Sequence, residues 1–267
     1  MYLHHSIKPY LNSSLPEFQQ FMALQGECFR LQKGRMTKRI YLGGQHYFIK
    51  QHTGVGWKEI IKNIFQWRMP VLSAQNEWLA IKKLQALGIA VPQILAYGKQ
   101  GFNPAKLQSF ILMQELCPTI SLETLCQSWQ EHPPTFKFKH QLLIKVAEIA
   151  KRLHEHGMNH RDFYLCHFLL DTHVANKDLM ADEIKLSLID LHRAQIRRLT
   201  PRRWIIKDLS GLYFSSKDIA LTRRDLFRFM KYYSGKSLRD IVKLDQPFWQ
   251  KVRTRGEQLY RNHTQGQ

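Results

Sequence analysis

The first part of the chain alternates strand-like runs with helical spacing. Between Glu27 and Gln51, apolar runs on either side of Gly43-Gly44 predict a β-hairpin whose second strand carries Lys50. Farther along, apolar residues recur at helical spacing in two segments and form short continuous runs in two others. The helical segments are Trp57–Trp67 and Ala74–Leu87, and the strand segments are Ile94–Tyr97 and Ser109–Leu116. We therefore expect residues 1–116 to form a sheet-rich lobe.

After Pro118 the pattern becomes mainly helical. Residues 138–156 carry apolar side chains on one helical face and stop at Gly157, where a left-handed residue commonly ends a helix. A loop then leads to two short strand-like runs, residues 168–170 and 185–190, and amphipathic helix follows from Trp204 onward. The expected fold class is α+β, with residues 117–267 as a helical second lobe.

Length and composition narrow the class of protein. The 267 residues suit one large domain or two lobes that share a cleft, and no apolar run approaches the roughly 20 residues of a membrane-spanning helix. Residues 1–16 lack the features of an export signal, so we expect a cytoplasmic protein. The four cysteines are scattered without a C-x-x-C pair, which argues against disulfides and zinc. They are Cys28, Cys117, Cys126 and Cys166.

The formal net charge of +19 implies an anionic partner, such as nucleic acid, an acidic membrane face or a polyanionic substrate. Basic residues are spread through the chain and are densest from His192 to Arg203. Charge alone does not choose among these partners, and a solvated cationic surface is a further reading.

Four residues in order point to phosphoryl transfer. His160-Arg161-Asp162, in a loop after a long helix, resembles the catalytic loop of protein kinases, in which the aspartate orients the acceptor hydroxyl. Asp190, at the end of a short strand, suits magnesium because that ion prefers carboxylate, phosphate and water oxygens. Lys50 on a strand and Glu77 in a helix have the order and element types of the pair that grips the nucleotide phosphates.

Each assignment has a plainer alternative. Lys50 could be an exposed strand lysine, and Glu77 could simply favour the positive end of its helix, with Glu59 as a rival partner for Lys50. Asp190 could cap the segment that follows. The glycines of the segment from Thr53 to Gly56 could touch phosphate, although a plain turn is favoured.

The chain also departs from the protein-kinase pattern. His167 stands where those enzymes have a magnesium-binding asparagine, and Asp190-Leu191-His192 stands where they have Asp-Phe-Gly. No Ala-Pro-Glu segment and no G-x-G-x-x-G loop is present. A small-molecule kinase is therefore favoured over a protein kinase. A zinc site at the nearby histidines, His154, His156, His160 and His167, lacks any supporting cysteine spacing.

Longer segments resemble the bacterial lipopolysaccharide core heptose(I) kinases, from about Leu24 to Lys243. They begin at Lys58 (KEIIKN), Arg68 (RMPVL), Pro118 (PTISLE), His160 (HRDFYLCHFLL), Ile189 (IDLHRAQ), Pro201 (PRRW) and Lys207 (KDLSGLYFSS). The resemblance implies a two-lobed, protein-kinase-like fold with a sheet-rich first lobe and a helical second lobe. It also implies transfer of the ATP γ-phosphate, with Mg²⁺, to the first heptose of the inner core.

For the site, the resemblance implies Asp162 as the catalytic residue, and His167 matches that family's own pattern. We assign Lys50 and Glu77 to the nucleotide and Asp190 with His167 to the metal. An anionic glycolipid at the cytoplasmic face of the inner membrane would explain the charge without a membrane span, and no nucleic acid is expected. Five arginines after Asp190 are candidates for docking this acceptor, because a guanidinium fits carboxylates and phosphates. They are Arg193, Arg197, Arg198, Arg202 and Arg203.

Three further expectations remain open at this point. Asp208 resembles the buried aspartate that braces the His-Arg-Asp backbone in protein kinases, although a helix N-cap is nearly as good a reading. A protein kinase is the alternative enzyme. A basic nucleic-acid-binding module is the alternative outside enzymes, motivated by the arginines near Trp204, but the chain carries no recognised nucleic-acid motif.

Overall fold

The computed structural model describes residues 1–32, 34–65, 71–173 and 183–266. These residues fall into two compact units. Unit 1 comprises Met1–Lys83 and Pro92–Leu116, and unit 2 comprises Leu84–Val91 and Cys117–Gln267.

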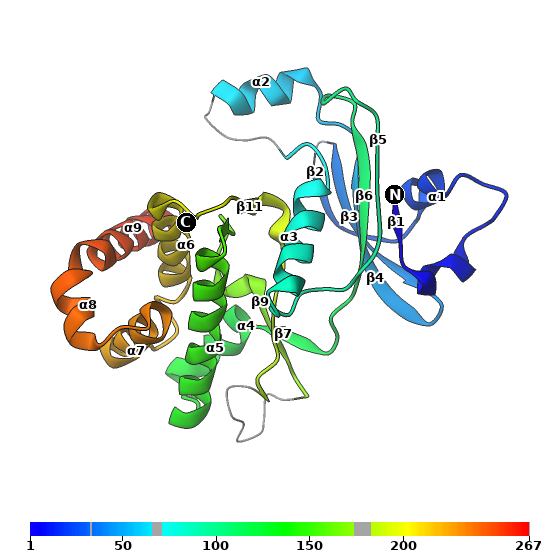
Figure 1. The fold of residues 1–267 in the computed structure, drawn as a ribbon. Coiled ribbons are helices and arrows are strands. Elements are labelled where there is room, and N and C mark those ends of the chain that lie inside the picture. Colours follow the sequence, from blue (N-terminus) through cyan, green and yellow to red (C-terminus); the bar gives the residue numbers. More distant parts are fainter. Residues whose placement is uncertain (33, 66–70, 174–182, 267) are drawn as a thin grey trace. The chain divides into compact units, whose positions relative to one another are not determined.

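Unit 1 is built on an antiparallel sheet with the strand order β1-β5-β6-β4-β3-β2 (Figure 1). The strands are β1 (Tyr2–Leu3), β2 (Glu27–Gln32), β3 (Arg35–Leu42), β4 (Gln45–His52), β5 (Ile94–Gln100) and β6 (Gln108–Gln114). The helical segments are η1 (His5–Tyr10), α1 (Glu17–Ala23), α2 (Trp57–Phe65) and α3 (Gln75–Ala86), whose last turn belongs to unit 2.

The predicted hairpin is formed by β3 and β4. Leu42 pairs with Gln45 across the turn, and Gly43 and Gly44 have φ values of +55° and +83°. Both values lie in the left-handed region, which a two-residue hairpin turn requires and which glycine adopts without strain.

Because side chains alternate along β4, one face of this strand packs into the core and the other carries Lys50. Tyr47 and Ile49 point into the buried core of unit 1, so Lys50 points to the other face. Helices cover both faces: Phe21 of α1 stacks on Phe110 of β6 on the core side, with ring centroids 4.5 Å apart. The start of α3 is attached to β6 by a hydrogen bond from the Ala74 N–H to the Ser109 hydroxyl (2.9 Å).

Unit 2 is mainly helical. Its helices are α4 (Leu122–Cys126), α5 (Phe136–Glu155), α6 (Arg202–Ser215), α7 (Arg223–Ser234), α8 (Leu238–Leu244) and α9 (Gln246–Gln265), with short 3-10 turns η2 (Gln127–Gln130), η3 (Leu165–His167) and η5 (Leu191–Arg193). Two small antiparallel sheets accompany them, with strand orders β10-β9-β7 and β11-β8. These strands are β7 (Thr119–Ser121), β8 (Met158–Asn159), β9 (Phe168–Asp171), β10 (Leu186–Leu188) and β11 (Gln195–Ile196).

Gly157 allows two segments of unit 2 to meet. Its φ of +75° ends the helical run of α5, and a Cβ atom there would collide with the carbonyl oxygen of Arg197. The Arg197 N–H donates to the Gly157 carbonyl (2.7 Å), and β8 then pairs with β11. The glycine therefore brings the loop that begins at β8 against the segment after Asp190.

An apolar cavity of about 560 Å³ lies among the helices of unit 2. Leu142, Leu143 and Val146 of α5 and Leu209 and Leu212 of α6 contribute much of its lining.

The elements expected from the sequence are largely present. The helix expected over 138–156 begins two residues earlier, at Phe136, because the Thr135 hydroxyl caps it by accepting the Phe138 N–H (3.2 Å). Strand β7 was not expected, since three residues are too few to show a period. The end of the expected helix Trp57–Trp67 and the segment beginning at Arg68 extend outside the described residues. No helix in the described ranges is long and apolar enough to cross a membrane.

Asp225 provides a testable electrostatic contribution to unit 2. It is only 3% exposed, completes the capping box of α7 with Thr222, and forms an ion pair with Lys139 of α5 (2.9 Å). Burial by itself would raise the pKa of Asp225, but the hydrogen bonds from Lys139 and Thr222 outweigh it and hold this pKa at about 2, below the ordinary 3.8.

Because the folded-state pKa is depressed, this stabilisation is present above pH 4 and is lost as the pH falls from about 4 to 2. We expect Asp225→Asn to lower the free energy of unfolding by about 2 kcal/mol at pH 7 and to remove that part of the acid dependence. Urea unfolding at a series of pH values measures both effects, and an unchanged acid dependence would contradict the assignment.

Candidate active site

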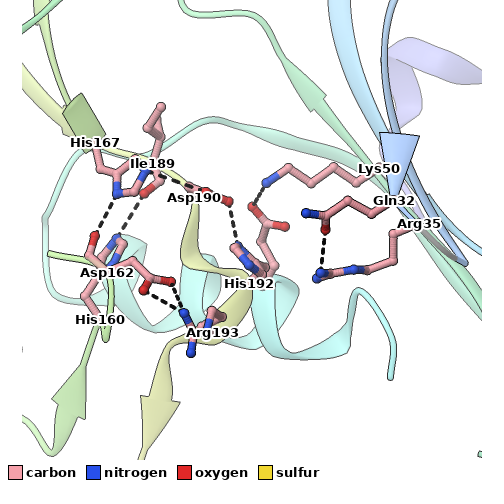
Figure 2. A network of polar contacts seen from close by, with 11 residues as sticks. Gln32, Arg35, Lys50, His160, Asp162, His167, Ile189, Asp190, His192 and Arg193 are labelled. Carbon is pink, nitrogen blue, oxygen red and sulfur yellow. Dashed lines mark hydrogen bonds and ion pairs between the residues drawn. The ribbon is translucent and has the colours of Figure 1, made fainter. Parts of the chain in front are cut away.

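The pairing of β9 with β10 brings the two predicted carboxylates of unit 2 into one neighbourhood. Phe168 pairs with Leu188, and just beyond this pair the Ile189 N–H donates to the His167 carbonyl (3.0 Å). Asp162 lies upstream of His167 and Asp190 directly follows Ile189, so both carboxylates leave the same end of the hairpin (Figure 2).

Two histidines follow one another in the Asp162 loop, and one of them, His160, bonds to the segment that carries Asp190 (Figure 2). Nε2 of His160 donates to the Ile189 carbonyl (3.0 Å), and Nδ1 of His167 donates to the carbonyl of Asp162 (2.7 Å). The two rings stack with centroids 5.6 Å apart. Burial lowers the pKa of His160, which keeps this ring neutral.

Asp208 holds the backbone of the loop. Its buried carboxylate accepts the N–H groups of His160 (2.6 Å) and Arg161 (2.8 Å), and Nε2 of His154 lies 3.4 Å away. Arg161 has a φ of +77°, a conformation that costs energy for a residue with a side chain. Asp208 is the seventh residue of α6, so the N-cap reading is wrong and the contacts of the bracing reading are present.

Asp190 adopts a left-handed conformation, with φ of 59° and ψ of 53°. Nδ1 of His192 donates to its Oδ1 (2.7 Å), and Nε2 of His167 lies 3.6 Å from its Oδ2. Because Nδ1 of His167 donates to a carbonyl, Nε2 is the ring nitrogen that faces Asp190. Asp190 and His167 are thus close enough to serve one metal ion.

Arg193 contacts Asp162 directly. Its Nη1 lies 2.8 Å from Oδ1 and 3.2 Å from Oδ2 of that carboxylate (Figure 2). The sequence predicted Arg193 among the acceptor-docking arginines without predicting this ion pair. A guanidinium here partly offsets the charge of Asp162 and restricts its orientation.

In unit 1, Nζ of Lys50 lies 2.6 Å from Oε1 of Glu77, and Glu77 is only 2% exposed. The ion pair that the sequence predicted is therefore present. The segment from Thr53 to Gly56 uses two of its N–H groups internally: Thr53 donates to the Gly34 carbonyl and Gly56 to the Ala105 carbonyl. These contacts favour the turn reading of this segment over phosphate binding.

The remaining arginines separate into different environments. Arg197 donates to Asn159 Oδ1 (2.6 Å), and both Arg197 and Arg203 lie beside the Trp204 ring. Arg202 lies over Phe248, 5.2 Å from the ring centroid, and Arg198 is exposed. The contiguous cluster of the sequence is therefore divided by the fold.

The sequence did not predict two further cations beside Trp204, which are Arg161 and Lys207. A signal for Lys207 was available, because Arg203 and Lys207 are four residues apart and so share a helix face. Arg161 gave no such signal, since only the loop conformation directs it toward Trp204. His192, which in the sequence is a departure from Asp-Phe-Gly, hydrogen-bonds Asp190 in the structure.

The model of the "Lipopolysaccharide kinase (Kdo/WaaP) family" matches residues 19–233. The chain belongs to this family. The predicted membership is confirmed, and with it the α+β kinase fold and a phosphotransferase activity. The Pseudomonas aeruginosa "Lipopolysaccharide core heptose(I) kinase WaaP" is 45% identical over 243 residues, which cover 91% of this chain and 90% of that protein.

Other lipopolysaccharide kinases of the family agree with this result. The protein of the same description from Escherichia coli (strain K12) is 46% identical over 242 residues, covering 91% of this chain and 90% of that protein. A solved structure, "WaaP in complex with acyl carrier protein", is 40% identical, with a TM-score of 0.83 over 97% of this chain and 98% of that one.

The contacts of Asp208 lead to a prediction. It distinguishes support of the His160–Arg161 backbone from a general contribution of Asp208 to stability. In Asp208→Asn one carboxylate oxygen becomes an NH₂ group, which leaves a buried N–H of His160 or Arg161 without an acceptor. We expect turnover to fall at least about tenfold, beyond the roughly 1–3 kcal/mol loss of stability that such a buried group causes. Steady-state kcat and thermal unfolding of the same preparations measure the two effects.

Asp225→Asn is the matched control, because it also neutralises a buried carboxylate of unit 2 and Asp225 does not contact the loop. This control should lose stability without a comparable loss of kcat. Equal losses of kcat in both variants would mean that Asp208 acts only through general stability.

Proposed function

We propose that the chain is an ATP-dependent kinase that phosphorylates the first heptose of the lipopolysaccharide inner core. One observation carries this proposal: Asp162 and Asp190, in a chain of the lipopolysaccharide kinase family, extend from the same hairpin end, and His160 of the Asp162 loop bonds to Ile189, the neighbour of Asp190. Phosphoryl transfer depends mainly on such positioning and on electrostatic stabilisation, since the protein forms no covalent bond to the phosphoryl group.

In this proposal Asp162 orients the acceptor hydroxyl and accepts its proton. Arg193 holds the Asp162 carboxylate and places a positive charge beside the site where phosphate charge develops. Lys50, kept in place by Glu77, binds the nucleotide phosphates.

A kinase family implies ATP as substrate and Mg²⁺ as its companion. Asp190 offers the carboxylate that magnesium prefers, and Nε2 of His167 lies 3.6 Å from that carboxylate as a second possible donor. So small a protein donor set suits an ion that keeps waters and phosphate oxygens as its other ligands. When bound, magnesium would neutralise charge on the phosphates.

The charge of the chain supports an anionic glycolipid acceptor at the cytoplasmic face of the inner membrane. Basic side chains near an anionic membrane can each contribute roughly 1 kcal/mol of attraction. Arg197 and Arg203, which lie together beside Trp204, are the best placed of the candidate docking arginines.

A transfer assay tests the proposal. With γ-labelled ATP and Mg²⁺, we expect label to enter heptose-containing core glycolipid, with no comparable labelling of protein and no competition by RNA. Asp162→Ala should reduce transfer by about 10²–10⁴-fold while ATP binding stays nearly intact, because its role is in the chemical step. Asp190→Ala should also weaken magnesium-dependent nucleotide binding.

Near-normal turnover of Asp162→Ala would refute the catalytic assignment. Labelling of added protein in preference to glycolipid would favour the protein-kinase alternative. Tight RNA binding without any phosphate transfer would favour the nucleic-acid-binding alternative.

We also infer a protein partner, because the solved relative is described as a complex with acyl carrier protein. The apolar cavity of unit 2, about 560 Å³, offers room for an acyl chain. We expect the chain to co-purify with an acyl carrier protein and to prefer the acylated over the unacylated form by at least about tenfold, because burying each CH₂ contributes about 0.8 kcal/mol.

Mass spectrometry of the co-purified partner and titration with both forms measure this preference. Equal affinity for the acylated and unacylated forms would mean that the cavity does not bind the acyl chain. No affinity for either form would mean that acyl carrier protein is not a partner of this chain.

A further inference from the structure

Four positive side chains of unit 2 surround the indole of Trp204. Measured to the ring centroid, the guanidinium carbon Cζ lies at 5.2 Å for Arg161, 5.6 Å for Arg203 and 5.7 Å for Arg197. Nζ of Lys207 lies at 5.2 Å. These five residues are called the Trp204 cluster below. They come from three places in the sequence: the loop after β8, the end of β11 and the first two turns of α6.

The cluster holds more positive charge than its surroundings offset. Within the described part of the chain, Arg161, Arg203 and Lys207 form no ion pair, although Asp162 and Asp208 are near enough to act on the pKa of Arg161 and Lys207 in the raising direction. The two nearby carboxylates are engaged elsewhere, Asp162 by Arg193 and Asp208 by backbone N–H groups. Burial, followed by the charges of Arg161 and Arg193, lowers the pKa of Lys207, as expected for a cation held among cations.

The cluster, together with Asn159 bonded to its Arg197, carries buried donors that lack acceptors. Among the described residues, Nε of Arg161, Nδ2 of Asn159 and Nε1 of Trp204 have no hydrogen-bond partner. Arg161 is 8% exposed and Asn159 is fully buried, with its Oδ1 already accepting from Arg197. All three atoms can only donate, so the group that would satisfy them is an acceptor, and the excess charge favours an anionic one.

We propose that the Trp204 cluster binds a carboxylate of the acceptor saccharide, next to Asp162. The inference rests on the proposed function and specifies how its acceptor is recognised. Arg161 is the chain neighbour of Asp162, so an anion held by the cluster lies close to the hydroxyl that Asp162 would orient. The guanidinium groups match the planar geometry of a carboxylate, and the indole excludes water, which strengthens the attraction.

Binding of deacylated inner-core saccharide, measured by calorimetry, tests the proposal. The saccharide is used in its native form and with its carboxylates chemically reduced to alcohols. Wild-type protein should bind the native form at least about tenfold more tightly, the size of effect expected when a charge-assisted pair is lost. In the double variant Arg203→Gln with Lys207→Gln, this ratio should fall to near one.

A matched control is available on α8. Arg239 and Lys243 are also four residues apart on a helix of unit 2, and both are exposed. Arg239→Gln with Lys243→Gln removes the same charge, so it reports any loss of general electrostatic attraction. This control should keep the wild-type ratio, and thermal unfolding should show that both double variants are folded.

The other outcomes decide between sources of the anion. If the cluster variant weakens ATP binding as strongly as saccharide binding, the anion belongs to the nucleotide and the proposal is wrong. The proposal also fails if wild-type protein binds native and reduced saccharide equally, or if the control variant loses the ratio too. Because wild-type transfer to native glycolipid is measured separately, any of these results can arise while the proposed function still holds.

Discussion

The buried carboxylate of Asp208 is the interaction on which the candidate site of unit 2 depends. It accepts two consecutive backbone N–H groups, of His160 and Arg161, and so fixes Arg161 at a positive φ that the residue would not adopt freely. This backbone turn sets the directions of Arg161 and Asp162 together. The side chain of Arg161 lies over Trp204, while Asp162 meets Arg193.

The rest of the site is connected to this turn by hydrogen bonds to backbone atoms. His160 reaches the carbonyl of Ile189 and so joins the Asp162 loop to the segment that carries Asp190, while His167 reaches the carbonyl of Asp162 within the loop itself. Carbonyl acceptors are fixed by the fold and do not titrate. The side-chain carboxylates of Asp162 and Asp190 are not used by these two imidazole–carbonyl bonds, and they contact Arg193 and His192 instead.

Charge is distributed unevenly around this scaffold. The formal net charge of +19 is spread over the sequence, yet the fold gathers Arg161, Arg197, Arg203 and Lys207 about one indole and directs Arg202 to Phe248. A carboxylate-lined surface would neutralise such a group, but here the neighbouring aspartates serve the loop and the chemistry. The net charge thus has a local consequence that composition cannot show.

The sequence by itself determined the elements and the residue types of the chemistry. The Gly43-Gly44 pair predicted the hairpin, the apolar runs beside it put Lys50 on the second strand, and the His160-Arg161-Asp162 triplet with Asp190 predicted a kinase. These features are local, because the residues of a turn, the period of a strand and the order of a motif depend on residues that are close in the sequence.

Contacts between distant segments were decided only by the tertiary structure. Arg193 meets Asp162 and Lys207 meets Arg161 around Trp204 because β8 pairs with β11 and Asp208 of α6 fixes the loop between them. No local pattern encodes these distances, since they depend on which surfaces are buried together and on a strained backbone held from another helix. For this reason the five arginines looked equivalent in the sequence and are not equivalent in the fold.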